Sequence, residues 1–144
     1  VIIDVWFAYT PSQVYAVLPT YGAQGRLLYA ASELTMDIAY PVLYSTLLWL
    51  LMASLFVRLL PATSRLEQLK KLPVLLFSLD ILENCGISAL LLSYPRQLDW
   101  LAWTTSFFST TKFVVGAAVL GILVFAVLAW AWVWLREKGL TLSR

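Results

Sequence analysis

The sequence predicts an all-α integral membrane protein, built as a helical bundle of three transmembrane helices. Of its 144 residues, 61% are hydrophobic and only 12% are charged, whereas soluble domains carry roughly 45–50% apolar residues. Residues 38–57 and 113–135 contain no charge, and about 20 apolar residues are enough for a helix to cross a bilayer. Residues 72–94 are equally apolar apart from a few polar side chains, so we expect a further span there.

The expected spans are about residues 36–59, 72–94 and 108–135. Together with a short cytoplasmic C-terminal tail they form a bundle of residues 35–144. Residues 1–34 are less apolar and contain several tyrosines, which favour the membrane–water interface. We therefore expect residues 1–34 to form an extracytoplasmic, interfacial helical segment before the first span.

Local signals divide this first segment into two helical stretches. Thr10 is followed by Pro11 and Gln13, a combination typical of a helix N-terminus with a capping box. Gly22 and Gly25 indicate a turn before the second stretch.

Basic residues give the expected orientation, because cytoplasmic loops are enriched in lysine and arginine. The connection after the first span and the C-terminal tail are rich in them: Arg58, Arg65, Lys70, Lys71, Arg136, Lys138 and Arg144. The remaining regions hold only three: Arg26, Arg96 and Lys112. We therefore expect the N-terminus of this chain outside and its C-terminus in the cytoplasm.

Composition also excludes several classes of function. Histidine is absent, which excludes His-ligated haem, a His-containing zinc site and a triad with an imidazole base. Cys85 is the single cysteine, so no disulfide can form within the chain. The basic residues form no stripe or aromatic-interleaved patch, which argues against nucleic-acid binding. We expect no cofactor and no metal; the expected partners are the lipid bilayer and either other membrane subunits or further copies of the chain.

The middle span carries an unusual polar group. Asp80, Glu83 and Asn84 share one helix face by their spacing of three and four residues. Counted from Tyr94, Glu83 lies roughly 16 Å deep, near the centre of a core about 30 Å thick. A charge at that depth costs at least about 2.5 kcal/mol, so we expect these side chains to face protein or a water-filled cavity.

The first span offers a matching polar stripe. Glu33, Asp37, Tyr40 and Tyr44 follow one another at steps of four, three and four residues. Pro41 has no N–H, so the carbonyl of Asp37 loses its helical partner and needs another donor. Tyr44 is expected to hydrogen-bond to a carboxyl of the middle span.

The third span also carries a polar face. Thr105, Ser109 and Lys112 share a face, and Lys112 is expected to pair with Asp37 rather than with the deeper Glu83. Three small residues farther along would let another helix approach closely: Gly116, Ala117 and Gly121.

Three interpretations of the polar residues stay open at this point. They form a hydrogen-bonded knot that fixes helix register, or a binding site for a proton, cation, lipid headgroup or small polar molecule, or an acid–base pair for catalysis. The candidate site consists of Asp37, Tyr40, Tyr44, Asp80, Glu83, Asn84 and Lys112. Its outer rim is expected to hold Arg26 and Glu33.

Recurring short elements give the chain a resemblance along nearly its whole length. It resembles an uncharacterised family of small multispanning prokaryotic membrane proteins with Gly-Arg-x-x-Tyr, Asp-x-x-Tyr-Pro-x-x-Tyr and Asp-x-x-Glu-Asn elements. These fall on Gly25, Arg26 and Tyr29; on Asp37, Tyr40, Pro41 and Tyr44; and on Asp80, Glu83 and Asn84. The resemblance implies a prokaryotic plasma membrane and one more helix upstream, giving four spans, but it implies no activity.

The expected function follows from these exclusions. We expect a non-catalytic integral membrane protein, an accessory or structural subunit of a larger membrane complex. The alternative is a transporter-like protein that binds a small molecule, lipid headgroup, proton or cation through the intramembrane carboxylates. Catalysis stays open only through the carboxyl pair Asp80 and Glu83, since we find no strong nucleophile, metal cluster or phosphate-binding loop in the sequence.

Overall fold

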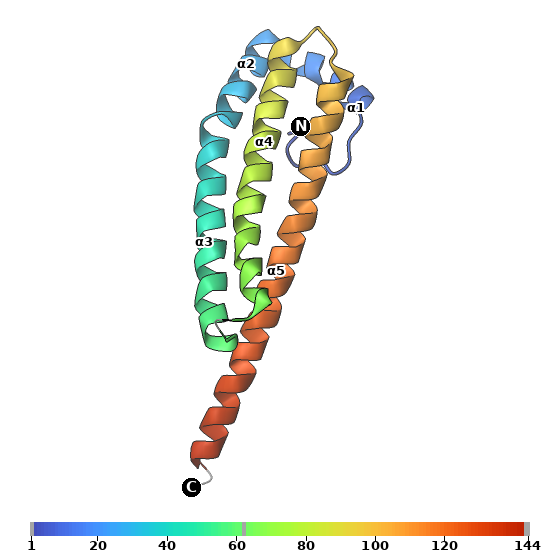
Figure 1. Ribbon diagram of the computed structural model, residues 1–144. Helices are drawn as coiled ribbons and strands as arrows, with labels where there is room; N and C mark the ends of the chain where they lie inside the picture. Colours follow the sequence, from blue (N-terminus) through green and yellow to red (C-terminus); the bar gives the residue numbers. More distant parts are fainter. Residues whose placement is uncertain (1, 62, 143–144) are drawn as a thin grey trace.

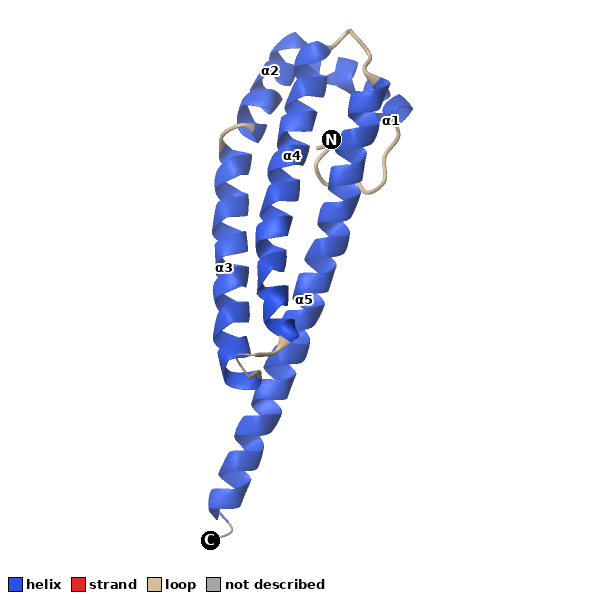
Figure 2. Cartoon of the chain, in the orientation of Figure 1, coloured by secondary structure: helices blue, strands red, loops and turns tan. Residues whose placement is uncertain are grey.

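The computed structural model describes residues 2–61 and 63–142, and every regular element in this part of the chain is helical (Figure 2). The elements in chain order are α1 (Pro11–Val17), the 3₁₀ helix η1 (Leu18–Tyr21), α2 (Gly22–Glu33), α3 (Met36–Leu59), the 3₁₀ helix η2 (Arg65–Lys71), α4 (Leu72–Ser93) and α5 (Asp99–Leu142). The expected all-α fold is confirmed.

Three long helices, α3, α4 and α5, run side by side with alternating direction (Figure 1). Three stretches are long and apolar enough to cross a membrane: Pro11–Leu59, Arg65–Ser93 and Asp99–Lys138. The number of these stretches agrees with the three spans expected from the sequence. Helix α5 begins at Asp99, well before residue 108, and continues past the ends of α3 and α4 (Figure 1).

The two ends of the bundle differ in charge. The end that holds α1, α2 and the α4–α5 connection is called the acid end; its charged residues are Asp4, Glu33, Asp37, Asp80, Glu83 and Asp99 against Arg26, Arg96 and Lys112. The end that holds η2 and the last turns of α5 is called the basic end; its charged residues are Arg58, Arg65, Lys70, Lys71, Arg136 and Lys138 against Glu67 and Glu137.

The acid end begins with the helix that the sequence predicts. The Thr10 side chain accepts a hydrogen bond from the Gln13 N–H, and the Gln13 side chain accepts one from the Thr10 N–H, so the capping box is confirmed. The expected turn is shorter than predicted, because it is confined to Gly22, whose φ of 67° lies in the left-handed region that glycine tolerates. Helix α2 then runs through Gly25 without interruption.

Gly86 of α4 lies in close contact with Thr105 of α5. A Cβ added at Gly86 would lie 2.3 Å from Thr105 Oγ1, so only glycine fits this position. One end of the α4–α5 contact is thus fixed at Gly86 and Thr105, and Gly116 faces Leu76 farther along, where an added Cβ would lie 3.7 Å from Leu76 Cδ1.

Two apolar clusters fill the interior, one on each side of the polar residues. The cluster at the acid end joins the N-terminal residues to α2, α4 and α5: Ile3, Tyr9, Val14, Tyr15, Leu18, Ala30, Ile87, Leu90, Leu91 and Ala102. The other lies between α3 and α5: Met52, Phe56, Val119, Leu123 and Ala126. Many large apolar side chains also cover the outside of the bundle, Val57 and Phe125 among them, as a lipid-facing surface requires.

Candidate functional site

Lys112 of α5 lies between two carboxylates of α4. Its Nζ is 3.1 Å from Asp80 Oδ1, and it also forms an ion pair with Glu83 Oε2. The Glu83 side chain is fully buried, while those of Lys112 and Asp80 are 15% and 10% exposed. The expected pairing of Lys112 with Asp37 is wrong, because the close register of α4 and α5 brings Lys112 level with Asp80 and Glu83.

Two hydrogen bonds join α3 to α4 at the same place. The Tyr44 hydroxyl donates to Asp80 Oδ2 at 2.5 Å, which is the expected bond from tyrosine to carboxyl. Asn84 Nδ2 donates to the backbone carbonyl of Asp37 at 2.6 Å. Pro41 leaves that carbonyl without its helical donor, and the Asn84 amide replaces it.

These bonds also place the polar residues along α3. Asp37 is the second residue of α3, so Asn84 and Glu83 lie beside the first turn of that helix. The last turns of α4, beyond Asn84, pack against α2 instead. Glu83 is therefore level with the first turn of α3, although it lies in the middle of α4 (Leu72–Ser93).

Residues 2–9, called the N-terminal segment, pack against the polar face of α5 and against α2. Side-chain hydrogen bonds hold its backbone: Ser109 Oγ donates to Trp6 O at 2.7 Å, Ala8 N–H donates to Thr110 Oγ1 at 3.2 Å, Ile3 N–H donates to Tyr29 OH at 2.7 Å, and Lys112 Nζ donates to Asp4 O at 3.5 Å. Non-helical backbone at membrane depth is tolerated where protein satisfies it. The sequence reasoning missed this contact, although the hydroxyl face of α5 was a signal that a partner was needed.

Glu33 of α2 is completely buried; neither of its carboxyl oxygens has a hydrogen bond of ordinary geometry in the described part of the chain, and the Tyr29 hydroxyl is a side-chain donor that lies within reach of it. Its expected place on the outer rim is wrong. The reason is that α2 packs against α4, where Ser88 Oγ donates to the Ala30 carbonyl at 3.4 Å, so the face of α2 that carries Ala30 and Glu33 points inward.

Buried polar atoms without partners are concentrated at this one place. Within residues 2–61 and 63–142, the buried side-chain atoms that lack a hydrogen bond belong to four residues: Asp4, Tyr9, Glu33 and Glu83. All three carboxyls lie close enough to act electrostatically on Tyr9. Glu83 has the Lys112 ion pair as compensation, whereas Glu33 has no ion pair in that part of the chain.

Carboxyls outnumber cations at this site. We call the following residues the acid cluster: Asp4, Glu33, Asp37, Asp80 and Glu83. They come from the N-terminal segment, α2, α3 and α4, and they lie within electrostatic reach of one another. Lys112 is the cation that contacts them. Three of these carboxyls are buried, those of Glu33, Asp80 and Glu83, and several buried negative charges facing one positive charge are strongly unfavourable.

In the N-terminal segment, outside the spanning helices, burial and neighbouring carboxyl charges raise the pKa values of acidic groups. Burial raises the pKa of the Asp4 carboxyl; Lys112 opposes this shift, and the charges of Asp37 and Asp80 add to it. Burial also raises the pKa of the Tyr9 phenol well above its usual value, and nearby carboxyl charges add to it: those of Glu83, Glu33 and Asp4.

Two cavities reach the acid cluster from the surface. The first has a volume of about 450 Å³ and is lined by Asp4, Asp37 and Tyr29 among others. The second has a volume of about 390 Å³ and reaches Asp80 and Lys112 between α3 and α5. Small solutes can therefore approach the carboxyls without the helices separating.

Tyr40 does not belong to the buried cluster, because its side chain is 67% exposed. The buried face of α3 contains Pro41 and Ser45, and Tyr40 is turned about 100° away from Pro41 at 3.6 residues per turn. Its ring packs against that of Tyr44, with 5.1 Å between ring centroids, and it lines the second cavity.

The remaining predicted residues lie farther out. Arg26 stacks on the Tyr94 ring, 4.5 Å from its centroid, at the acid end. Gly116 and Ala117 line the second cavity. An added Cβ at Gly121 would meet no atom within 4 Å. Of the three small residues, only Gly116 therefore faces a neighbouring helix of this chain closely.

The comparisons with known proteins add no relative: no family model, curated protein or solved structure matches the chain. Among the described residues, no group of three or more Asp, Glu, Cys or His side chains has the arrangement of a metal site.

Proposed function

We propose that this chain is a non-catalytic membrane protein that binds protons in its acid cluster, as a proton-responsive component of the membrane. The observation that carries the proposal is the full burial of Glu33, with neither carboxyl oxygen in a hydrogen bond of ordinary geometry in the described part of the chain, beside four further carboxyls and a single lysine. A buried carboxyl without a partner is most cheaply neutralised by taking up a proton.

The arrangement around the cluster supports exchange of that proton. The Tyr29 hydroxyl accepts the Ile3 N–H, which leaves its own proton to donate, and it lies within reach of Glu33. It also lines the first cavity together with Asp4 and Asp37. A continuous set of acidic and phenolic groups thus runs from an open cavity to the buried carboxyl.

Proton uptake by the purified protein tests the proposal. In lipid nanodiscs, wild type is expected to take up more protons per chain between alkaline and mildly acidic pH than the Glu33→Gln/Glu83→Gln variant. Glu137→Gln, which removes an exposed carboxyl at the basic end, is the matched control; it should lower uptake only in the acidic range of an ordinary glutamate, near pH 4.3.

Equal titration curves for wild type and the double variant would contradict the proposal. Proton release on adding sodium or potassium salt would show that a metal cation competes with the bound protons for the acid cluster.

A second candidate function, an accessory subunit of a membrane complex, is favoured by α5. The last turns of α5 extend beyond α3 and α4 (Figure 1), and the side chains of Trp132 and Trp134 on this helix are exposed. A partner chain could pack there. Native mass spectrometry after extraction in mild detergent tests this: a companion subunit is expected, and a chain that always travels alone would contradict it.

The orientation and the kind of membrane belong to the same proposal. The distribution of lysine and arginine supports a cytoplasmic basic end, and the resemblance described above supports a prokaryotic plasma membrane. A cysteine introduced at Gln97, in the α4–α5 connection, should react with an impermeant reagent added outside intact cells once Cys85 is replaced by alanine. Reaction only after permeabilisation would reverse the orientation.

A further inference from the structure

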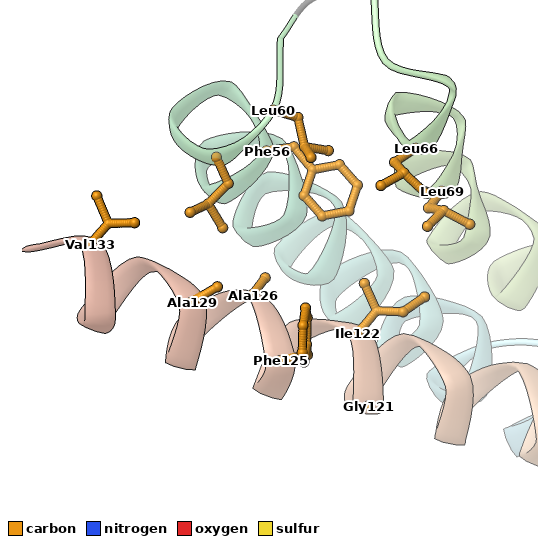
Figure 3. A pocket seen from close by; sticks show the side chains of 11 residues that line it. Phe56, Leu60, Leu66, Leu69, Gly121, Ile122, Phe125, Ala126, Ala129 and Val133 are labelled. Carbon is orange, nitrogen blue, oxygen red and sulfur yellow. The ribbon is translucent and has the colours of Figure 1, made fainter.

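An apolar groove opens at the basic end, far from the acid cluster. It has a volume of about 620 Å³, within the roughly 300–1,000 Å³ of typical ligand pockets. Figure 3 shows its walls: Phe56 from α3 and Leu60 directly after that helix, Leu66 and Leu69 from η2, and Gly121 and Phe125 from α5. All of these are apolar, so the groove suits a hydrocarbon chain.

Basic residues are next to groove-lining residues in the sequence, on the elements that form the groove walls. Arg58 is next to the lining residue Leu59, Arg65 is next to Leu66, and Lys71 ends η2. All three basic side chains are exposed, and none forms a salt bridge within the described part of the chain. Lys70 differs, because it is paired with Glu67.

Aromatic residues on α5 mark the same level as an interface. Arg58 lies over the Trp130 ring at 5.9 Å from its centroid, and Arg136 lies over Trp132 at 5.0 Å. Stacked arginine and tryptophan are typical of the headgroup region, where an apolar ring and a charged group meet water together. We therefore expect the groove to begin at the level of the lipid phosphate groups and to lead into the hydrocarbon.

We propose that this groove holds an acyl chain of an anionic phospholipid, whose phosphate is bound by Arg58, Arg65 and Lys71. Charge decides between this occupant and a second copy of the chain. A second copy inserted in the same orientation would bring another basic end against the first, and like charges brought together at an interface are unfavourable. An anionic headgroup instead neutralises the excess positive charge, and basic pockets between helices are known to bind such headgroups.

Gly121 allows a direct test of the groove. Because an added side chain there meets no atom of the protein within 4 Å at its Cβ, Gly121→Leu should fill the groove without disturbing the fold. Ala118→Leu is the matched control, since Ala118 is exposed on the same helix and does not line the groove. For the headgroup, Arg65→Gln/Lys71→Gln is compared with Arg96→Gln, which removes a basic residue at the acid end.

The measurement is retention of phosphatidylglycerol and phosphatidylcholine, each added to the purified full chain and followed by native mass spectrometry. Wild type is expected to retain phosphatidylglycerol at least several-fold better than phosphatidylcholine. Gly121→Leu and Arg65→Gln/Lys71→Gln should each lower that retention several-fold, and the two control variants should not. Equal retention of both lipids, or no effect of Gly121→Leu, would overturn the proposal. So would a dimer that Gly121→Leu dissociates, because the groove would then be an interface between copies.

Discussion

At the scale of single residues, the clearest link from sequence to structure is the carbonyl of Asp37. Pro41 predicts from the sequence alone that this carbonyl lacks a helical donor, and the structure supplies Asn84 Nδ2 at 2.6 Å. The donor could not be identified from sequence, because that needs the relative height of α3 and α4. The relative height of the helices was also needed to identify the partners of Lys112, and without it the sequence predicted the wrong one.

Replacing Asn84 by leucine should therefore destabilise the protein. Leucine has a similar size but cannot donate, so the Asp37 carbonyl would be left buried without a partner, at a cost of about 1–3 kcal/mol. Thermal unfolding in detergent, followed by intrinsic fluorescence, should show a lower midpoint. Cys85→Ala, at the exposed neighbouring position, is the control, and an Asn84→Leu midpoint as high as that of Cys85→Ala would contradict this account of the bond.

At the scale of elements, α4 and α5 illustrate how a helix pair is set by one close contact. The sequence indicated small residues at Gly116, Ala117 and Gly121 as the packing site, but the tight contact is at Gly86. Glycine in the middle of a helix was a signal, since it costs roughly 0.5–1 kcal/mol relative to alanine and calls for a structural reason. Which glycine faces a neighbour depends on helix rotation, and the sequence does not specify that.

Two matched glycine substitutions test this contact. Gly86→Ala places a Cβ 2.3 Å from Thr105 Oγ1 and should destabilise the protein by about 1–3 kcal/mol through overpacking. Gly116→Ala places a Cβ at an ordinary 3.7 Å from Leu76 and should be neutral or slightly stabilising. The thermal unfolding midpoints of both variants are compared, and Gly86→Ala should have the lower one. Similar midpoints would show that the α4–α5 contact is not set at Gly86.

The N-terminal segment is the element that sequence reasoning described least well. An interfacial segment was expected for residues 1–34, but residues 2–9 are tied to α2 and α5 by side-chain bonds to their backbone. Irregular segments carry no periodicity, so their docking site cannot be read from a pattern.

Packing of this segment should weaken as pH rises. Burial raises the pKa of Asp4 above the value it has when the segment is released, so the protonated form favours the packed state. The stabilisation is present at low pH and is lost as pH rises through the raised pKa. Hydrogen exchange of residues 2–9, expressed as the ratio of wild type to Asp4→Asn at each pH, should increase with pH. A ratio independent of pH would contradict this coupling.

At the scale of the whole molecule, the fold is well determined by composition, while the site is determined only in part. The apolar runs predict the three long helices, because in lipid an apolar stretch of that length has no alternative to a helix. The polar residues of α3, α4 and α5 were predicted to meet, and most of them do. The contributions of Asp4, Tyr9 and Glu33 to one buried site could not be predicted, since they depend on how the acid end folds over the bundle.

The molecule thus separates two environments along its length: an acid-rich interior at one end and a basic surface with an apolar groove at the other. The central claim is that the acid cluster holds more carboxyls than its single lysine can neutralise, so that at least one carboxyl is protonated at neutral pH.

Infrared difference spectroscopy of the carboxylic-acid C=O stretch tests this most directly, with the protein in lipid at neutral pH. The account predicts a protonated-carboxyl band in wild type and in Glu137→Gln that is reduced or lost in Glu33→Gln/Glu83→Gln. A wild-type spectrum without any protonated carboxyl at neutral pH, or a band of equal intensity in the double variant, would contradict it.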